Sequence, residues 1–191
     1  MKKTLAVLLT LAAISFSALT LTGCPPVPVP QDDTDVSQSQ AVSAKAEFSA
    51  DDIAVAYDGV TVRPNDDASA ILAKLGDGYE YQEAISCTYS ENGMDKGFTY
   101  NDGGVIIATV PLNAGADYIN GLDTSEDGWM TGKGIAVGST RNDVVSAYGE
   151  PHYDEGGFIA YYADKNDPVS ASLCFTLEND AVTCIGIGAG H

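Results

Sequence analysis

The sequence predicts an α+β fold of two similar halves, each a helix followed by an antiparallel meander, which share one sheet with the helices on one face. Short runs rich in β-branched and aromatic residues alternate with Gly, Asn and Asp clusters, which is typical of strands joined by tight turns. Two amphipathic helical segments end at Gly76 and Gly149. Hydrophobic residues make up 45% of the 191 residues, enough for a folded core.

The first 24 residues predict export and lipid anchoring. Residues 1–23 have the form of a signal peptide, because Lys2 and Lys3 precede an uncharged apolar run from 4 to 21. The run leads to Leu21-Thr22-Gly23-Cys24, which resembles a bacterial lipobox. The resemblance implies cleavage before Cys24 and acylation of its thiol, for example with palmitate. An uncleaved membrane helix is the alternative, but the apolar run is near the shortest that can span a bilayer.

Residues 24–47 predict a flexible tether, because proline, acidic residues and Ser-Gln repeats cannot bury enough apolar surface to fold. As a coil, this segment would span about 27 Å. Removal of Lys2 and Lys3 leaves 9 − 2 = 7 basic residues against 27 acidic ones, a net charge of −20. Such a charge excludes a nucleic-acid-binding protein and favours a protein partner with a basic patch.

The first half, residues 48–130, begins with a hairpin whose turn is Asp58-Gly59. Asn65 or Asp66 is then expected to cap a helix that ends at Leu75. Strands are predicted at 81–88, 97–100, 105–110 and 118–124, with a turn at 101–104 between two of them.

The second half, residues 131–191, is predicted to repeat this order. A short extended piece at Ile135 and Val137 precedes a helix over 141–148, which Thr140 and Asp143 cap as a capping box. Strands follow at 158–162, 171–177 and 181–187. The two helix-ending glycines are 149 − 76 = 73 residues apart, which favours a duplicated unit; chance similarity of two amphipathic helices is the alternative.

A family resemblance rests mainly on the segment from Gly134 to Pro151, which reads GIAVGSTRNDVVSAYGEP. It resembles the opening motif of lipoproteins of the SmpA/OmlA type and of beta-lactamase-inhibitor-protein-like (BLIP-like) domains. Together with the first-half segments 86–87, 95–100 and 108–111, the chain resembles tandem lipoproteins of Gram-positive bacteria. The resemblance implies a concave antiparallel sheet and an envelope location. It transfers no activity, because the matching residues are mostly glycine, helix and turn positions.

The sequence offers no catalytic constellation, and it predicts neither an enzyme nor a cofactor. The only histidines are His152 and His191, and no nucleophile elbow, zinc-ligand spacing or phosphate-binding loop is present. His152 directly follows Pro151 and is therefore expected to be a loop residue.

One stretch partly matches a calcium loop. Asp123, Ser125 and Asp127 provide oxygen ligands at positions 1, 3 and 5, and Gly128 stands at position 6. Position 12 is Gly134 rather than the usual glutamate, so an ordinary acidic loop is favoured over a cation site.

With Cys24 acylated, three cysteines remain: Cys87, Cys174 and Cys184. Cys174 and Cys184 flank a predicted turn near 178–180. A three-residue loop would place them opposite each other on one face, where they could form a disulfide, whereas a two-residue loop would place them on opposite faces. This pair is favoured slightly over one that includes Cys87, and three buried thiols are the alternative.

The single tryptophan, Trp129, lies between the halves, and we expect it to pack at their junction rather than serve as an exposed interaction anchor. The sequence as a whole predicts a lipid-anchored protein on the extracytoplasmic face of the membrane. Its expected role is a non-enzymatic protein-interaction module that uses an exposed sheet face or the groove between the halves. The alternative is a protein that binds a small ligand or a cation such as calcium.

Overall fold

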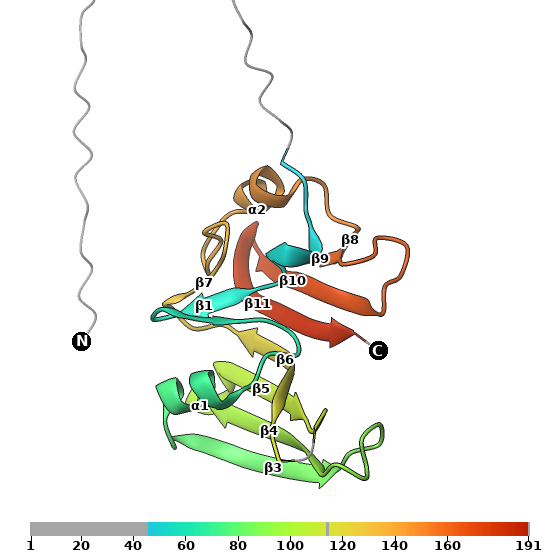
Figure 1. Ribbon diagram of the computed structural model, residues 1–191. Coiled ribbons are helices and arrows are strands. Elements are labelled where there is room, and N and C mark those ends of the chain that lie inside the picture. Colours follow the sequence, from blue (N-terminus) through green and yellow to red (C-terminus); the bar gives the residue numbers. More distant parts are fainter. Residues whose placement is uncertain (1–45, 114, 191) are drawn as a thin grey trace, which may run out of the picture. The chain divides into compact units, whose positions relative to one another are not determined.

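The computed structural model describes residues 46–113 and 115–190 (Figure 1). The predicted signal peptide, the lipidation site Cys24 and nearly all of the tether lie outside the described residues. Among the described residues, no helix has both the length and the apolar character needed to span a bilayer.

The predicted α+β class is wrong, because the structure is mostly β, with 46% strand and 15% helix. It contains an eight-stranded antiparallel sheet and a three-stranded sheet. The two helices, α1 (Ser69–Leu75) and α2 (Arg141–Tyr148), are each only about 12 Å long or less. A sheet of eight strands is about 34 Å wide, so a layer of two such helices cannot cover it. The small sheet packs on it as well.

The strand order of the large sheet is β3-β4-β5-β6-β11-β10-β9-β8, and that of the small sheet is β2-β1-β7. Short 3-10 turns lie at Ala50–Asp52 and Asn101–Gly103. The strands are β1 (Val55–Tyr57), β2 (Val60–Val62), β3 (Tyr79–Ile85), β4 (Met94–Tyr100), β5 (Val105–Val110), β6 (Tyr118–Thr124), β7 (Trp129–Thr131), β8 (Tyr153–Glu155), β9 (Phe158–Tyr162), β10 (Ser170–Glu178) and β11 (Ala181–Gly190).

The large sheet consists of two consecutive four-strand meanders, β3 to β6 and β8 to β11. Their last strands pair with each other, so that Gly121 lies opposite Gly188 and Thr124 opposite Ile185. The strand order therefore has the same pattern from either edge: an outer first strand, then successive strands toward a shared centre.

Several predicted elements are confirmed. The hairpin of β1 and β2 turns at Asp58-Gly59, whose φ values of 43° and 84° suit a two-residue turn of type I′. Thr140 and Asp143 form the capping box of α2, with the Thr140 hydroxyl accepting from the Asp143 backbone N–H. Strands β5, β6 and β9 begin and end where the sequence predicts.

The predicted cap of α1 and the extended piece near Ile135 are wrong, although α1 ends at Leu75 as predicted. Helix α1 begins at Ser69, and the Asp67 carboxylate accepts from the Ser69 N–H at 2.8 Å; Asp66 instead accepts from the Arg63 N–H. The segment with Ile135 and Val137 forms no strand and makes only a single bridge, between Ala136 and Met130. The extended piece at the junction is β7, which pairs with β1 of the first half.

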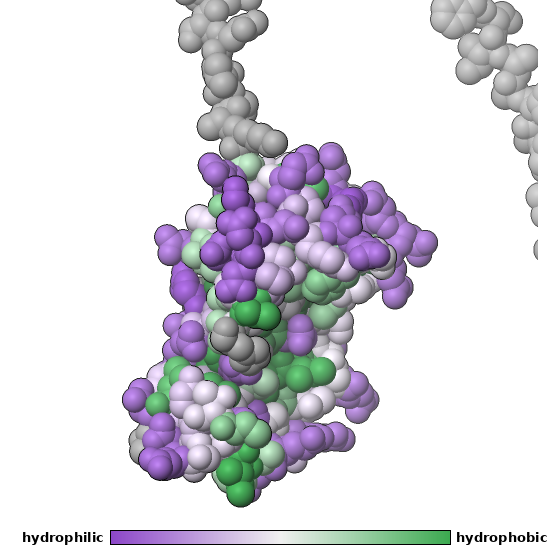
Figure 2. Space-filling view, turned by 90° about the vertical axis from the view of Figure 1, so that its right-hand side faces the viewer, coloured by the Kyte–Doolittle hydropathy of each residue, from purple (hydrophilic) through white to green (hydrophobic). Residues whose placement is uncertain are grey.

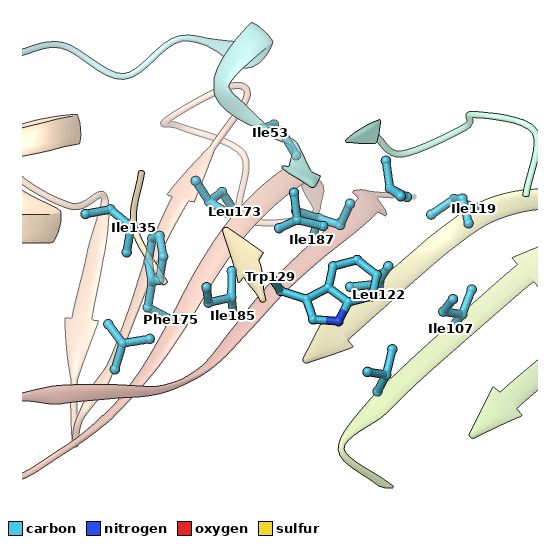
Figure 3. Close-up of a cluster of buried hydrophobic side chains, with 14 of the residues drawn as sticks. Ile53, Ile107, Ile119, Leu122, Trp129, Ile135, Leu173, Phe175, Ile185 and Ile187 are labelled. Atoms are coloured by element: carbon cyan, nitrogen blue, oxygen red, sulfur yellow. The ribbon is translucent and has the colours of Figure 1, made fainter. Parts of the chain in front are cut away.

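The hydrophobic core lies on one face of the large sheet, which we call the core face. Its strands contribute buried side chains at alternate positions, including Phe98, Ile107, Leu122, Tyr161, Phe175 and Ile185. Ile71 of α1 and Val144 and Tyr148 of α2 join them. Figure 3 shows Trp129 among Leu122, Ile185 and Ile187, where β6 meets β11.

Candidate functional site

The opposite face of the large sheet, which we call the open face, is the main candidate site. Its side chains come from the strand residues that alternate with the buried core-face residues. The open-face positions are Glu80, Gln82 and Ala84 on β3; Asp95, Gly97 and Thr99 on β4; Ile106, Ala108 and Val110 on β5; Tyr118, Gly121 and Asp123 on β6; Ala181, Cys184, Gly186, Gly188 and Gly190 on β11; Ser170, Ser172, Cys174, Thr176 and Glu178 on β10; Phe158, Ala160 and Tyr162 on β9; Tyr153 and Glu155 on β8.

Small residues fill the centre of the open face and larger apolar ones flank it. Ala108, Gly121, Gly186 and Gly188 occupy neighbouring positions where the two meanders join. Ile106 on one side and Tyr153 and Phe158 on the other are 42%, 42% and 39% exposed. Figure 2, seen from the right-hand side of Figure 1, shows pale and green surface around the middle of the body, where its outline is indented, and purple surface toward both ends.

The charges on the open face are all negative. Five carboxylates lie there, those of Glu80, Asp95, Asp123, Glu155 and Glu178, and no Lys or Arg occupies any of its strand positions. None of the four ion pairs within the described residues includes these carboxylates. The face is therefore electrostatically complementary to a basic surface.

Asp123 lies at the centre of this face, beside the join of β6 and β11. Its carboxylate lies against Gly186, where a Cβ would be only 2.5 Å from Asp123 Oδ1. A side chain at 186 would therefore displace the Asp123 carboxylate from its place beside the backbone of β11. The sheet removes part of the water around this carboxylate, and this desolvation raises its pKa above the ordinary value of 3.8.

Cys174 and Cys184 lie on the same open face, beside Asp123. The turn between β10 and β11 has two residues, Asn179 and Asp180, which alone would have placed the two cysteines on opposite faces. A bulge at Thr183 shifts the register, so that Cys184 pairs with Thr176 and Cys174 with Gly186. Sequence reasoning missed this bulge.

The predicted disulfide between Cys174 and Cys184 is not formed, and Cys87 is also a free thiol. The two cysteines are diagonal rather than direct neighbours, a separation of about 7–8 Å that is too long for a disulfide without backbone movement. Burial raises the pKa of both thiols, and the negative charge of Asp123 raises each further. Both are therefore poor nucleophiles at neutral pH.

The predicted calcium loop is not assembled as a binding site. Asp123 belongs to strand β6, Ser125 directs its hydroxyl toward the Gly104 carbonyl at 3.5 Å, and Asp127 is exposed. Within the ranges 46–113 and 115–190, no three His, Cys, Asp or Glu side chains gather so that they could hold a metal ion. A strand cannot wrap its side chains around one cation as a loop can.

Trp129 is not an exposed interaction anchor, because only 1% of it is exposed. Its ring stacks on that of Tyr57 at 4.9 Å between centroids, and β7 pairs with β1. The expectation that Trp129 packs at the junction is confirmed.

His152 lines a cleft of about 660 Å³ with Phe48, Tyr148, Tyr162 and Lys165 among its neighbours. Its Nδ1 accepts from the Tyr162 backbone N–H at 2.9 Å, and its ring packs edge-on against Phe48. Ser49 also lines the cleft, but its hydroxyl donates to Asp52. The structure thus gives His152 a packing role and shows no Ser–His couple at this cleft.

Comparisons of the chain with protein-family models, curated proteins and solved structures found no match in any of the three.

Proposed function

We propose that this chain is a non-enzymatic, lipid-anchored protein-interaction module, which binds a basic patch of a partner protein on the open face. The observation that supports this function best is the open face itself, with five carboxylates and no basic side chain among its strand positions. Charges arranged in this way steer association and select the partner.

The apolar content of the open face supports the same proposal. Tyr153, Phe158 and Ile106 are large, exposed side chains beside a centre of glycine and alanine. Aromatic residues at the side of a flat centre can anchor a partner, while the small residues let its backbone approach the sheet closely.

The proposed location is the extracytoplasmic side of the membrane, with the protein held by lipid on Cys24. The described body begins at Ala46, so a tether of about two dozen residues would separate it from the bilayer. We expect Cys24→Ser to release the protein from the membrane fraction. An intact mass that shows an unmodified chain still beginning with Met1 would refute the anchor.

The interaction is tested by placing a photoreactive amino acid at Ala108 or Ser172 on the open face of the full chain in its native membrane. A matched position is Ser146, which is exposed on α2. We expect one salt-sensitive crosslinked protein from the open-face positions, and less of it after Asp95→Asn and Asp123→Asn. Equal crosslinking from Ser146, or crosslinking that ignores salt, would contradict the proposal.

A second candidate function is small-ligand binding in the cleft beside His152. Its volume of about 660 Å³ lies in the range of small-molecule sites, and Phe48 and Tyr162 provide aromatic walls. A ligand that binds only the native state raises the melting temperature. A metabolite panel that raises it in the full chain, but not in a Phe48→Ala variant, would support this candidate.

A further inference from the structure

The two edges of the large sheet differ in a way that points to a second binding surface. The β8 edge is only three residues long, and its Asp154 lies at a core-face position, where it pairs with Arg141. Short edges and inward-pointing charges are devices that prevent further strand pairing. The β8 edge is therefore closed to strand addition.

The β3 edge is more than twice as long, with seven residues against three, although its Glu83 also stands at a core-face position. All seven residues from Tyr79 to Ile85 pair with β4 without a register shift. The strand contains no proline, lysine or bulge, and no other strand of the described residues pairs with its outer side. Every second residue therefore presents an unpaired N–H and C=O outward. Figure 1 shows β3 at the end of the body opposite the point where the described chain begins.

The side chains of β3 define what could pair there. Tyr81 and Ile85 point to the same side of the strand and are 46% and 70% exposed. Glu80 and Glu83 are exposed and have no ion-pair partner among the described residues. The Tyr81 hydroxyl donates to Glu83 at 2.5 Å, and Lys96, which lies opposite Glu83 on β4, forms its ion pair with Asp117 instead. The edge combines an open backbone, two exposed apolar side chains and two carboxylates that form no ion pair among the described residues.

We propose that the outer edge of β3 binds an extended segment of a partner protein that carries Lys or Arg at alternate positions, which adds a ninth strand to the sheet. Backbone hydrogen bonds would provide affinity. Alternate residues of a strand share one face, so the basic side chains would lie beside Glu80, and the residues between them beside Tyr81 and Ile85 on the other face. A second copy of this chain fits less well, because pairing would bring together two edges that carry Glu80 and Glu83 on proteins of net charge −18. The backbone edge of β3 borders the open face and shares Glu80 with it, but strand addition at this edge goes beyond the function proposed above.

The test uses the full chain and a fluorescent heptapeptide of alternating lysine and valine, with a glutamate-for-lysine peptide as its counterpart. Two further lysine peptides carry N-methyl groups on one or the other set of alternate amides. Only one set of amides can face β3, so we expect one methylated peptide to bind at least about tenfold more weakly and the other to bind normally. We expect the glutamate peptide not to bind.

A matched control comes from β8, where the Tyr153 hydroxyl donates to Glu155 at 2.8 Å and thus repeats the Tyr81–Glu83 pair. Glu80→Lys with Glu83→Lys should weaken binding of the lysine peptide roughly threefold to tenfold, whereas Glu155→Lys should leave it within about twofold. Amide hydrogen exchange should slow in residues 79–85 and not in 153–155.

Several results would overturn the inference. One is equal weakening of binding by both sets of N-methyl groups, and another is equal weakening by the β3 and β8 charge reversals. A third is slower amide exchange in residues 79–85 at high protein concentration without peptide, which would identify a second copy of the chain as the occupant. Asp123→Asn should not change peptide binding. If this variant abolishes it, the peptide lies on the open face, so the edge inference fails while the proposed function stands.

Discussion

Replacing Trp129 by alanine is expected to lower the free energy of unfolding by about 3–5 kcal/mol. Only 1% of Trp129 is exposed, and burying a tryptophan removes about 150–250 Å² of surface from water. At about 25 cal/mol per Å², this burial contributes about 4–6 kcal/mol, of which alanine would retain a small part. Loss of the stack on Tyr57 adds about 0.5–1.5 kcal/mol.

Urea unfolding followed by far-UV circular dichroism measures this change without relying on tryptophan fluorescence. With a slope near 2 kcal/mol per molar urea, the unfolding midpoint should fall by about 1.5–2.5 M. The control is Met130→Ala on the same strand, whose residue is 48% exposed and should change stability by no more than about 0.5 kcal/mol. Similar shifts for the two variants, or a loss below about 1 kcal/mol for Trp129→Ala, would refute the assignment of Trp129 to the core.

Three other predictions concern local features. Thr140→Ala removes the cap of α2 and should cost about 1 kcal/mol in urea unfolding. Cys87 should react with an aromatic disulfide reagent faster than Cys174 and Cys184, because it is exposed while burial raises the pKa of the other two thiols. The pKa of Asp123 is raised in the folded protein above its ordinary value. Protonation of Asp123 therefore stabilises the folded protein at low pH, and this stabilisation is lost as the pH rises through the pKa of the folded state. Asp123→Asn should therefore stabilise the protein at pH 7, and its advantage should vanish below the ordinary pKa of 3.8, as thermal melts across pH would show.

The elements that could be predicted are those with a strong local signal. Alternation of apolar and polar residues is clear in β5, where Val105 and Ile107 are buried and Ile106 is exposed. The capping box at Thr140 likewise acts within four residues. Such signals depend on neighbouring positions only, so the sequence reveals them without knowledge of the tertiary fold.

The features that could not be predicted depend on distant parts of the chain. Strand β7 forms because β1, more than seventy residues earlier, offers it an edge, and β8 has three exposed residues and no hydrophobic pattern. The α+β prediction assumed that the two helices form a layer over the sheet, but both helices are too short to cover eight strands.

An exposed sheet face is expected from the sequence as the interaction surface, but for the same reason the sequence does not identify the residues on that face. Asp95, Asp123 and Glu155 come together on one face only once the strand order is known, and a single bulge at Thr183 decides which face Cys184 occupies. A shift of one residue reverses the side of every later side chain in a strand. The sequence shows which residues are acidic, but it does not show that these residues share one face of the sheet.

The pairing of β6 with β11 also bears on how such a protein could have originated. If each meander descends from an independent protein, the fourth strand of that protein would have been an unpaired edge strand. Two identical copies would then have dimerised by pairing their fourth strands about a two-fold axis. Gene fusion would turn this dimer into one polypeptide, whose stability no longer depends on protein concentration. A fragment that stops after Thr124 is accordingly expected to self-associate through β6.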